Sequence, residues 1–131
     1  MPETKPRGPS VLIVAPPGRL RDALQVMVRA VPQIGYTVQT DDAPAVLSAA
    51  EHYPALVLLD TDLPGHEAWT VLQQIKARWP QTRCIVLVNN GQQSQIANAH
   101  GADAVLVKGF MGVTLKETVA KLLYEEVGGE M

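Results

Sequence analysis

Four uninterrupted runs of apolar residues constrain the fold of this chain more than any other feature of its sequence. They are Val11–Ala15, Ala55–Leu59, Cys84–Val88 and Ala104–Val107. A short apolar run without alternating polar residues is typical of a strand that is covered on both faces. Each run is also far too short to cross a lipid bilayer. The sequence therefore predicts buried strands inside a layered fold.

Helical patterns alternate with these runs. Apolar residues recur at helical spacing between the strands, and a fifth, shorter strand is predicted at Tyr36–Gln39. The predicted helices cover Leu20–Val31, Pro44–His52, Ala68–Trp79, a short segment ending near His100, and a last segment that includes Leu115–Leu123. Alternation of this kind requires parallel strands joined by right-handed crossovers. We therefore predict an α/β fold, a doubly wound five-stranded parallel sheet with five flanking helices, of either the flavodoxin-like or the half-Rossmann kind.

Local signals mark several helix ends. Asp42 is a candidate N-cap for the second helix, and Gly101 follows the fourth helix, where a left-handed cap is expected. Asn89–Gln92 is predicted to be a loop before that fourth helix. Thr114 and Glu117 have the spacing of a capping box, although the last helix could also start a few residues earlier.

The length and charge of the chain fit one small domain with neither a nucleic acid nor a membrane as its partner. Residues 11–127 are predicted to form this domain, with a flexible tail at 1–10 and another at 128–131. The 11 basic and 13 acidic residues give a net charge of -2, and no run of basic residues stands out. No signal peptide is visible at the start of the chain, so the cytoplasm is the expected location.

Charged and polar residues follow the strands where each one ends. Because parallel strands end at the same edge of a sheet, these residues are expected to lie together. They are Ala15–Gly18, Asp60–Asp62, Val88–Asn90 and Lys108–Gly109. Taken alone, Asp60 fits a loop acid or a helix cap equally well, and Lys108 fits a lysine whose stem covers apolar surface. The pair is more specific, because it places a carboxylate and an ammonium at one edge.

Motifs for nucleotides, metals and nucleophilic catalysis were not found. The first strand-to-helix turn has one glycine, Gly18, and no phosphate-binding loop follows any strand. The three histidines have no metal-ligand spacing with one another or with the single cysteine, Cys84. Cys84 begins an apolar run, which favours a buried small side chain over a reactive thiol. These absences predict that the domain is not an enzyme.

Two segments resemble the signature of response-regulator receiver domains, the CheY-like superfamily. Ala55–Gly65 reads ALVLLDTDLPG, which is an apolar strand, an Asp, three residues and Pro-Gly. Gly101–Gly109 reads GADAVLVKG, which is Gly-Ala-Asp, a strand and a Lys. The resemblance covers about Val11–Val127, and it implies a flavodoxin-like sheet with the strand order 2-1-3-4-5.

The resemblance implies a role in two-component phosphorelay signalling. In that family a kinase histidine passes a phosphoryl group to the Asp, while Mg²⁺ bridges that Asp, a backbone carbonyl two residues later and an acidic pair after the first strand. By resemblance, Asp60 is the phosphoacceptor and a metal ligand. Asp62 would offer its carbonyl or its side chain to the metal. Lys108 and Asn89 would contact the phosphoryl group.

Several positions depart from the family pattern. The acidic pair falls on Ala15 and Pro16, whose side chains cannot ligate a hard cation. The hydroxyl position after the fourth strand falls on Val88, or on Asn89 if the register slips by one residue. The aromatic position on the fifth strand falls on Val105. We therefore expect any Mg²⁺ site to be weak or absent.

Two hypotheses follow within this family, and one lies outside it. A degenerate receiver would act without phosphorylation, by docking a partner signalling protein, a sensor histidine kinase, or a second copy of itself through the last helix and the fifth strand. An active but atypical phosphoreceiver would still accept a phosphoryl group on Asp60. An unrelated small α/β enzyme or ligand binder is the third alternative, and no cofactor loop supports it. The missing acidic pair favours the degenerate receiver.

Overall fold

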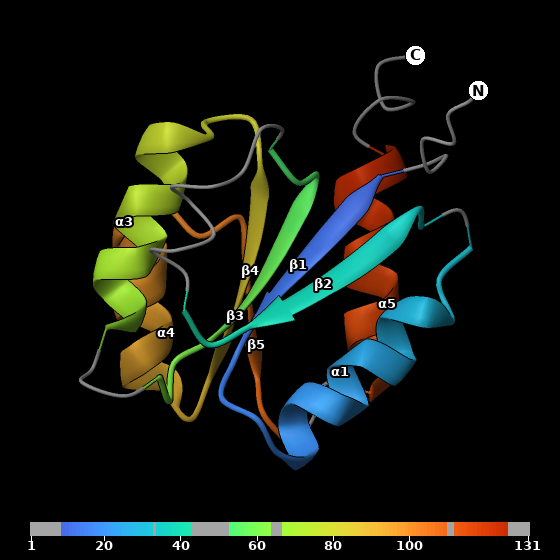
Figure 1. Ribbon diagram of the computed structural model, residues 1–131. Coiled ribbons are helices and arrows are strands. Elements are labelled where there is room, and N and C mark those ends of the chain that lie inside the picture. The colour runs from blue at the N-terminus through green and yellow to red at the C-terminus, as the bar shows by residue number, and fades with distance from the viewer. Residues whose placement is uncertain (1–8, 33, 43–52, 64–66, 110–111, 126–131) are drawn as a thin grey trace.

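The protein forms one five-stranded parallel sheet with helices on both faces (Figure 1). The computed structural model describes residues 9–32, 34–42, 53–63, 67–109 and 112–125. The strands are β1 (Ser10–Val14), β2 (Tyr36–Thr40), β3 (Leu56–Asp60), β4 (Arg83–Val88) and β5 (Ala104–Val107). Their order in the sheet is β2-β1-β3-β4-β5, which confirms the flavodoxin-like order and excludes the half-Rossmann alternative.

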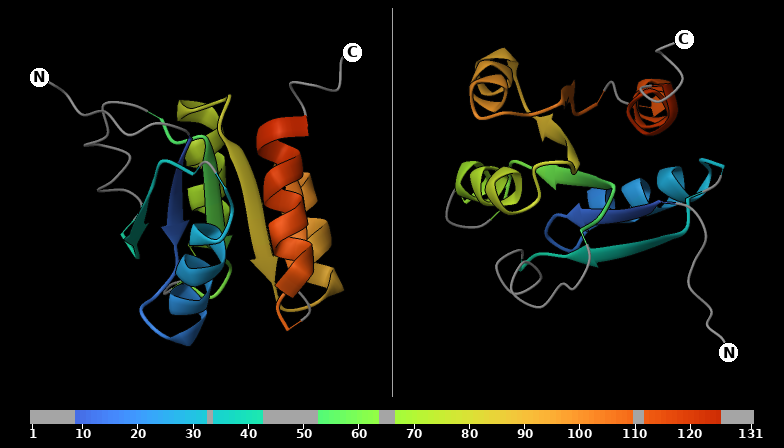
Figure 2. Two further views of the ribbon diagram at one scale, coloured as in Figure 1. Left: turned by 90° about the vertical axis from the view of Figure 1, so that its right-hand side faces the viewer. Right: turned by 90° about the horizontal axis from the view of Figure 1, so that it is seen from above.

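Two helices cover each face of the sheet within the described residues. They are α1 (Arg19–Arg29), α3 (Ala68–Arg78), α4 (Gly91–Ala99) and α5 (Gly112–Ala120), the last continuing as the π-helical segment η2 (Lys121–Glu125). Figure 2 shows α3 and α4 on one side of the sheet and α1 and α5 on the other. The helix predicted at Pro44–His52 lies outside the described residues.

The core consists of two apolar layers, one on each face of the sheet. Successive residues of a strand point to opposite faces, so Leu12 and Val14 pack under α3 and α4 while Val11 and Ile13 pack under α1 and α5. Every residue of β3 is buried. This explains why the strands read as continuous apolar runs instead of alternating patterns.

Helices α3 and α4 also touch through an aromatic contact. The ring of Trp69 stacks on that of His100 at the C-terminal end of α4, with 5.9 Å between ring centroids. The Nδ1 atom of His100 lies 2.9 Å from the carbonyl of Ile96, which fixes the imidazole against its own helix. Trp79, at the end of α3, is buried in the core instead.

The fourth helix begins earlier than the sequence predicted. Its first residue is Gly91, so the predicted loop at Asn89–Gln92 is shorter by two residues. The reason is a cap that was not recognised: the side chain of Asn90 accepts a hydrogen bond from the backbone N–H of Gln93 at 3.0 Å. The helix ends as predicted, with Gly101 in a left-handed conformation at φ 97°.

The last helix starts before the capping-box spacing of Thr114 and Glu117, at the earlier position that the sequence left open. The helix α5 already begins at Gly112, so Thr114 lies within its first turn. Leu115 and Val119 lie on the buried side of this helix, where they join the core layer shared with α1.

Asp103 joins three segments at the amino-terminal ends of β4 and β5, which is the end of the sheet away from Asp60 and Lys108. One carboxylate oxygen accepts from the backbone N–H of Cys84 at 2.7 Å and from the ammonium of Lys76 at 3.0 Å. The other lies 3.4 Å from the guanidinium of Arg83. Asp103 therefore connects the start of β4 with α3 and with the turn before β5. Cys84 itself is buried as predicted, and this burial raises the pKa of its thiol to about 12.

No helix among these described segments is long and apolar enough to cross a membrane.

We predict that Asp103→Ala lowers the free energy of unfolding by about 1–3 kcal/mol, because it leaves the backbone N–H of Cys84 and the Lys76 ammonium without their carboxylate. Urea unfolding followed by circular dichroism measures this. The matched control is Glu117→Ala on the exposed side of α5, which should change stability by about 0.5 kcal/mol or less. Equal effects of the two substitutions would contradict the assignment.

Candidate functional site at the strand ends

Asp60 is held firmly at the end of a central strand. It is the last residue of β3, it lies opposite Leu87 of β4, and only 4% of its surface is exposed. The next residue continues the ladder, since the N–H of Thr61 donates to the carbonyl of Leu87 at 3.2 Å. One oxygen of the Asp60 carboxylate accepts from the backbone N–H of Asp62 at 3.0 Å. The carboxylate is therefore buried, and a backbone N–H holds one of its oxygens.

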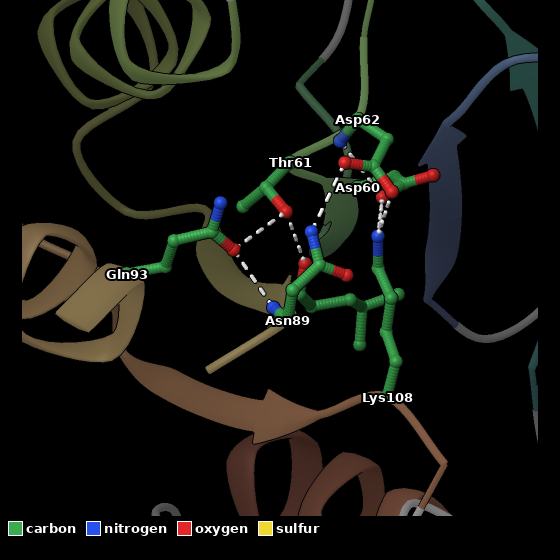
Figure 3. Close-up of polar contacts among 7 residues, drawn as sticks. Asp60, Thr61, Asp62, Asn89, Gln93 and Lys108 are labelled. Atoms are coloured by element: carbon green, nitrogen blue, oxygen red, sulfur yellow. Dashed lines mark hydrogen bonds and ion pairs between the residues drawn. The ribbon is translucent and has the colours of Figure 1, made fainter. Parts of the chain in front are cut away.

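Lys108 reaches this carboxylate from the edge strand. Its backbone N–H donates to the carbonyl of Val88 at 2.9 Å, which extends the pairing of β5 with β4 to the strand end. Its ammonium forms an ion pair with the Asp60 carboxylate and a second one, at 2.8 Å, with that of Asp62 (Figure 3). The two residues predicted to converge are therefore in contact. Their roles in phosphoryl chemistry stay predictions.

Asp62 lies between two donors on the outer side of the site. One oxygen accepts from Lys108, and the other accepts from the side-chain amide of Asn89 at 3.1 Å (Figure 3). Lys108 first, and Asn89 second, hold the pKa of the Asp62 carboxyl below its ordinary value of 3.8. Because 59% of the Asp62 side chain is exposed, these contacts fix its direction more than they stabilise the fold.

Thr61 and Gln93 belong to this site although the sequence did not single them out. The side-chain oxygen of Gln93 accepts from the backbone N–H of Asn89 at 2.7 Å and lies 3.2 Å from the hydroxyl of Thr61 (Figure 3). The Thr61 hydroxyl is also 3.0 Å from the carbonyl of Leu87. A signal was present, because Asn90 and Gln93 have the spacing of a capping box. Recognising it would have placed the glutamine beside the strand end.

The end of β1, next to β3 in the sheet, brings no carboxylate. Ala15 is fully buried, and Pro16 follows it. The carbonyl of Ala15 instead accepts a hydrogen bond from the guanidinium of Arg21 at 3.2 Å. A cation on α1 therefore lies at the strand end where the resemblance implies an acidic pair.

The donors at this edge do not fit a Mg²⁺ ion. Mg²⁺ favours six oxygen ligands in near-octahedral geometry and uses carboxylates to secure them. Asp60 and Asp62 are the carboxylates at the end of β3, and the Lys108 ammonium contacts both. Asp41 and Asp42 follow β2, which lies two strands away from β3 in the sheet. Across the described residues, no three acidic, histidine or cysteine side chains are grouped so that they could hold a metal ion.

The other positions that depart from the family pattern are apolar and packed. Val88 is fully buried in the core, so it presents no hydroxyl at the strand end. Val105 packs against the core layer under α3 and α4. Asn89 is therefore the polar side chain after β4 that meets Asp62. The Pro-Gly pair of the signature lies outside the described residues.

We predict that Lys108→Met raises the pKa of Asp62 toward 3.8, because it removes the hydrogen bond that is the largest cause of the lowered pKa. Since the folded pKa is lower than the unfolded one, the contact stabilises the fold above the unfolded pKa, and this contribution is lost as the pH falls through the folded pKa. A ¹³C titration of the Asp62 carboxyl measures the change. Lys116→Met, on the exposed side of α5, is the control and should leave the titration unchanged.

Comparison with known proteins agrees with this geometry. The response regulator receiver domain family matches residues 11–120. The chain is 36% identical over 83 residues to the chemotaxis protein CheY of Bacillus subtilis (strain 168), covering 62% of this chain and 69% of CheY. It is 29% identical over 96 residues to the Fimbriae Z protein of Salmonella typhimurium, covering 72% of this chain and 46% of that relative, so it spans less than half of the latter.

Solved structures show the same fold. A CheY-like response regulator receiver domain protein from Methanospirillum hungatei JF-1 superposes with a TM-score of 0.78 at 20% identity, over 93% of this chain and 98% of the other. The family match, the curated relative and the strand order are consistent with one another. The chain therefore belongs to the response regulator receiver domain family of two-component signalling proteins.

Proposed function

We propose that this receiver domain is a degenerate member that signals by protein–protein contact and does not depend on phosphorylation of Asp60. The observation that carries this proposal is the charge balance at the carboxyl ends of the strands. Lys108 pairs with both carboxylates, and Ala15 and Pro16 stand where the resemblance implies an acidic pair.

The electrostatics of phosphoryl transfer support this proposal. Transfer to a carboxylate requires positioning and stabilisation of the charge that spreads over the phosphoryl oxygens. A close ion pair near a protein surface contributes several kcal/mol. The absence of two carboxylates near Asp60 therefore weakens the binding of a divalent cation by roughly that amount, unless other ligands replace them. The ammonium of Lys108 adds repulsion against a metal ion at the same place.

The partner in this proposal is a signalling protein of a two-component pathway in the cytoplasm, such as a sensor histidine kinase, or a second copy of the domain. The edge strand β5 and the helix α5 form the surface proposed for a homodimer. Val107, the last residue of β5, is 37% exposed, and Val38, the other exposed valine of the described sheet at 42%, lies on the opposite edge strand β2. An apolar side chain on an open edge strand is suited to packing against another chain.

A second candidate function is that of an active, atypical phosphoreceiver. Two observations favour it: Asp60 is buried and fixed, and Lys108 contacts its carboxylate. In that case Asp60 accepts the phosphoryl group, Lys108 and Asn89 contact it, and Asp60 with Asp62 forms a weak metal site.

A titration with Mg²⁺ and beryllofluoride, followed by amide NMR, separates the two functions. We expect no saturable shifts around Asp60, because the ligands that would secure the metal are missing. The control is Asp60→Asn, which removes the acceptor carboxylate while keeping its shape. Saturable, Mg²⁺-dependent shifts that disappear in Asp60→Asn would overturn the proposal that this is a degenerate receiver. Incubation with acetyl phosphate and Mg²⁺, read by intact mass, gives an independent answer, since only the active form gains a phosphoryl group on Asp60.

Light scattering over a range of concentrations tests the homodimer. We expect a mass that rises with concentration and does not respond to phosphodonor. Val107→Lys should weaken the association about tenfold or more, which equals about 1.4 kcal/mol of binding free energy. Val38→Lys is the matched control, because Val38 is a valine of similar exposure, 42%, on β2 at the opposite edge of the sheet. A monomer at every concentration, or equal effects of the two lysines, would rule out this dimer surface.

A further inference from the structure

The edge strand β2 lacks the features that usually keep another strand from pairing with an edge. It has β1 on one side and no strand of the described sheet on the other (Figure 1). Edge strands of natural proteins are commonly blocked by lysine, proline or a bulge. The segment Tyr36–Thr40 reads YTVQT, without charge or proline, and its register with β1 is continuous. The sequence of β2 therefore favours pairing with one more extended segment.

Two residues of β2 direct their backbone hydrogen-bonding groups away from the sheet. The carbonyl of Thr40 accepts from the N–H of Ala15 at 2.9 Å, so the backbone groups of Thr40 point toward β1. The backbone groups of successive strand residues point alternately to the two sides of the strand. The N–H and C=O groups of Thr37 and Gln39 consequently point outward. In an added antiparallel strand, a residue opposite either of them would exchange both N–H···O bonds with it.

A cavity with a cation lies where this edge begins. It has a volume of about 280 Å³ and is lined by Arg29, Ile34, Gly35 and Thr37. Thr37 lies opposite Val11, which packs under α1, so its side chain is on the face that this helix covers. Arg29 is exposed at the end of α1, and no carboxylate among the described residues pairs with its guanidinium. The cavity therefore offers a guanidinium, a hydroxyl and an apolar wall to an acidic side chain.

The two ends of the β2 edge carry opposite charges. Arg29 lies at the start of the strand, and the exposed residues Asp41 and Asp42 follow its end. An antiparallel segment would therefore meet the aspartates with a basic residue at its beginning and Arg29 with an acidic residue at its end. Between these ends, Val38 is 42% exposed and offers an apolar cross-strand contact. The charges thus tie the direction of a bound segment to its sequence.

We propose that β2 is a docking edge for an extended segment of a partner protein, which pairs antiparallel with β2 and inserts an acidic side chain into the cavity beside Arg29. Backbone hydrogen bonds supply the affinity, and the charges at the two ends supply the selection. The inference goes beyond the proposed function, because β2 lies across the sheet from β5 and its pairing does not depend on the charge of Asp60.

The test uses the peptide acetyl-Lys-Val-Thr-Val-Thr-Val-Asp-amide, which has the proposed order of charges and no charged terminus. Amide NMR of the full chain follows Thr37 and Gln39 as this peptide is added, and we expect saturable shifts at both. Replacing the Asp of the peptide by Asn should weaken binding about tenfold or more, as for the loss of a charge-assisted hydrogen bond. A third peptide, with the Lys and the Asp exchanged, should bind as weakly, because its charges fit a parallel strand.

Variants of the protein locate the site. Arg29→Gln should weaken binding of the first peptide about tenfold, and the Asn peptide should then bind it about equally well, because both changes remove the same contact. Arg19→Gln is the matched control, since it removes the same charge from an exposed arginine at the other end of α1, and it should leave binding within about twofold. Gln39→Pro removes an outward N–H, which an edge strand tolerates, and should abolish the shifts while circular dichroism shows the domain folded.

Several results would overturn this docking edge. They are the absence of saturable shifts at Thr37 and Gln39, equal effects of Arg29→Gln and Arg19→Gln, and equal binding of the peptide with exchanged charges. A mass in light scattering that rises with concentration and falls in Val38→Lys without peptide would assign the edge to a second copy, and would also overturn it. Each of these results leaves the proposal of a degenerate receiver to the beryllofluoride titration, which examines the carboxyl ends of the strands.

Discussion

The arrangement of side chains at the carboxyl ends of the strands depends on the two ion pairs of the Lys108 ammonium. Asp60 and Asp62 present two carboxylates that are close enough to share one cation. At the distance of a contact, two like charges near a protein surface repel by about 4 kcal/mol. A cation between them removes this cost. Lys108 can reach them because β5 pairs with β4 up to its last residue. The edge strand β5 therefore positions the cation that pairs with the carboxylates at the end of the central strand β3.

This arrangement also gives the departures from the family pattern a physical meaning. A metal ion would balance the carboxylates of a receiver site from outside the chain. Here a tethered side chain balances them, and Arg21 adds a second cation at the end of β1. A resident cation cannot be diluted or chelated away. The charge balance of this edge is therefore built into the folded domain, which is consistent with a domain that signals by contact.

Much of the fold could be predicted from the sequence because buried strands leave a strong pattern. Each apolar run corresponds to a strand, and the carboxyl ends of parallel strands meet, so the contact of Asp60 with Lys108 followed from topology alone. The side-chain contacts of Asp62, Asn89 and Gln93 did not follow, because they depend on where α4 begins and on individual rotamers. The start of α5 shows the same limit, because the capping-box spacing at Thr114 left two possible starts and the structure has the earlier one.

The two tryptophans of α3 have a consequence for spectroscopy. Trp79 is enclosed in the core, whereas Trp69 stacks on His100 at the far end of α4. Emission from Trp79 reports whether the domain as a whole is folded. Emission from Trp69 depends on the imidazole beside it, and hence on how α3 and α4 lie against each other. The chain therefore carries two intrinsic fluorophores on one helix that distinguish global unfolding from a local displacement of its neighbour.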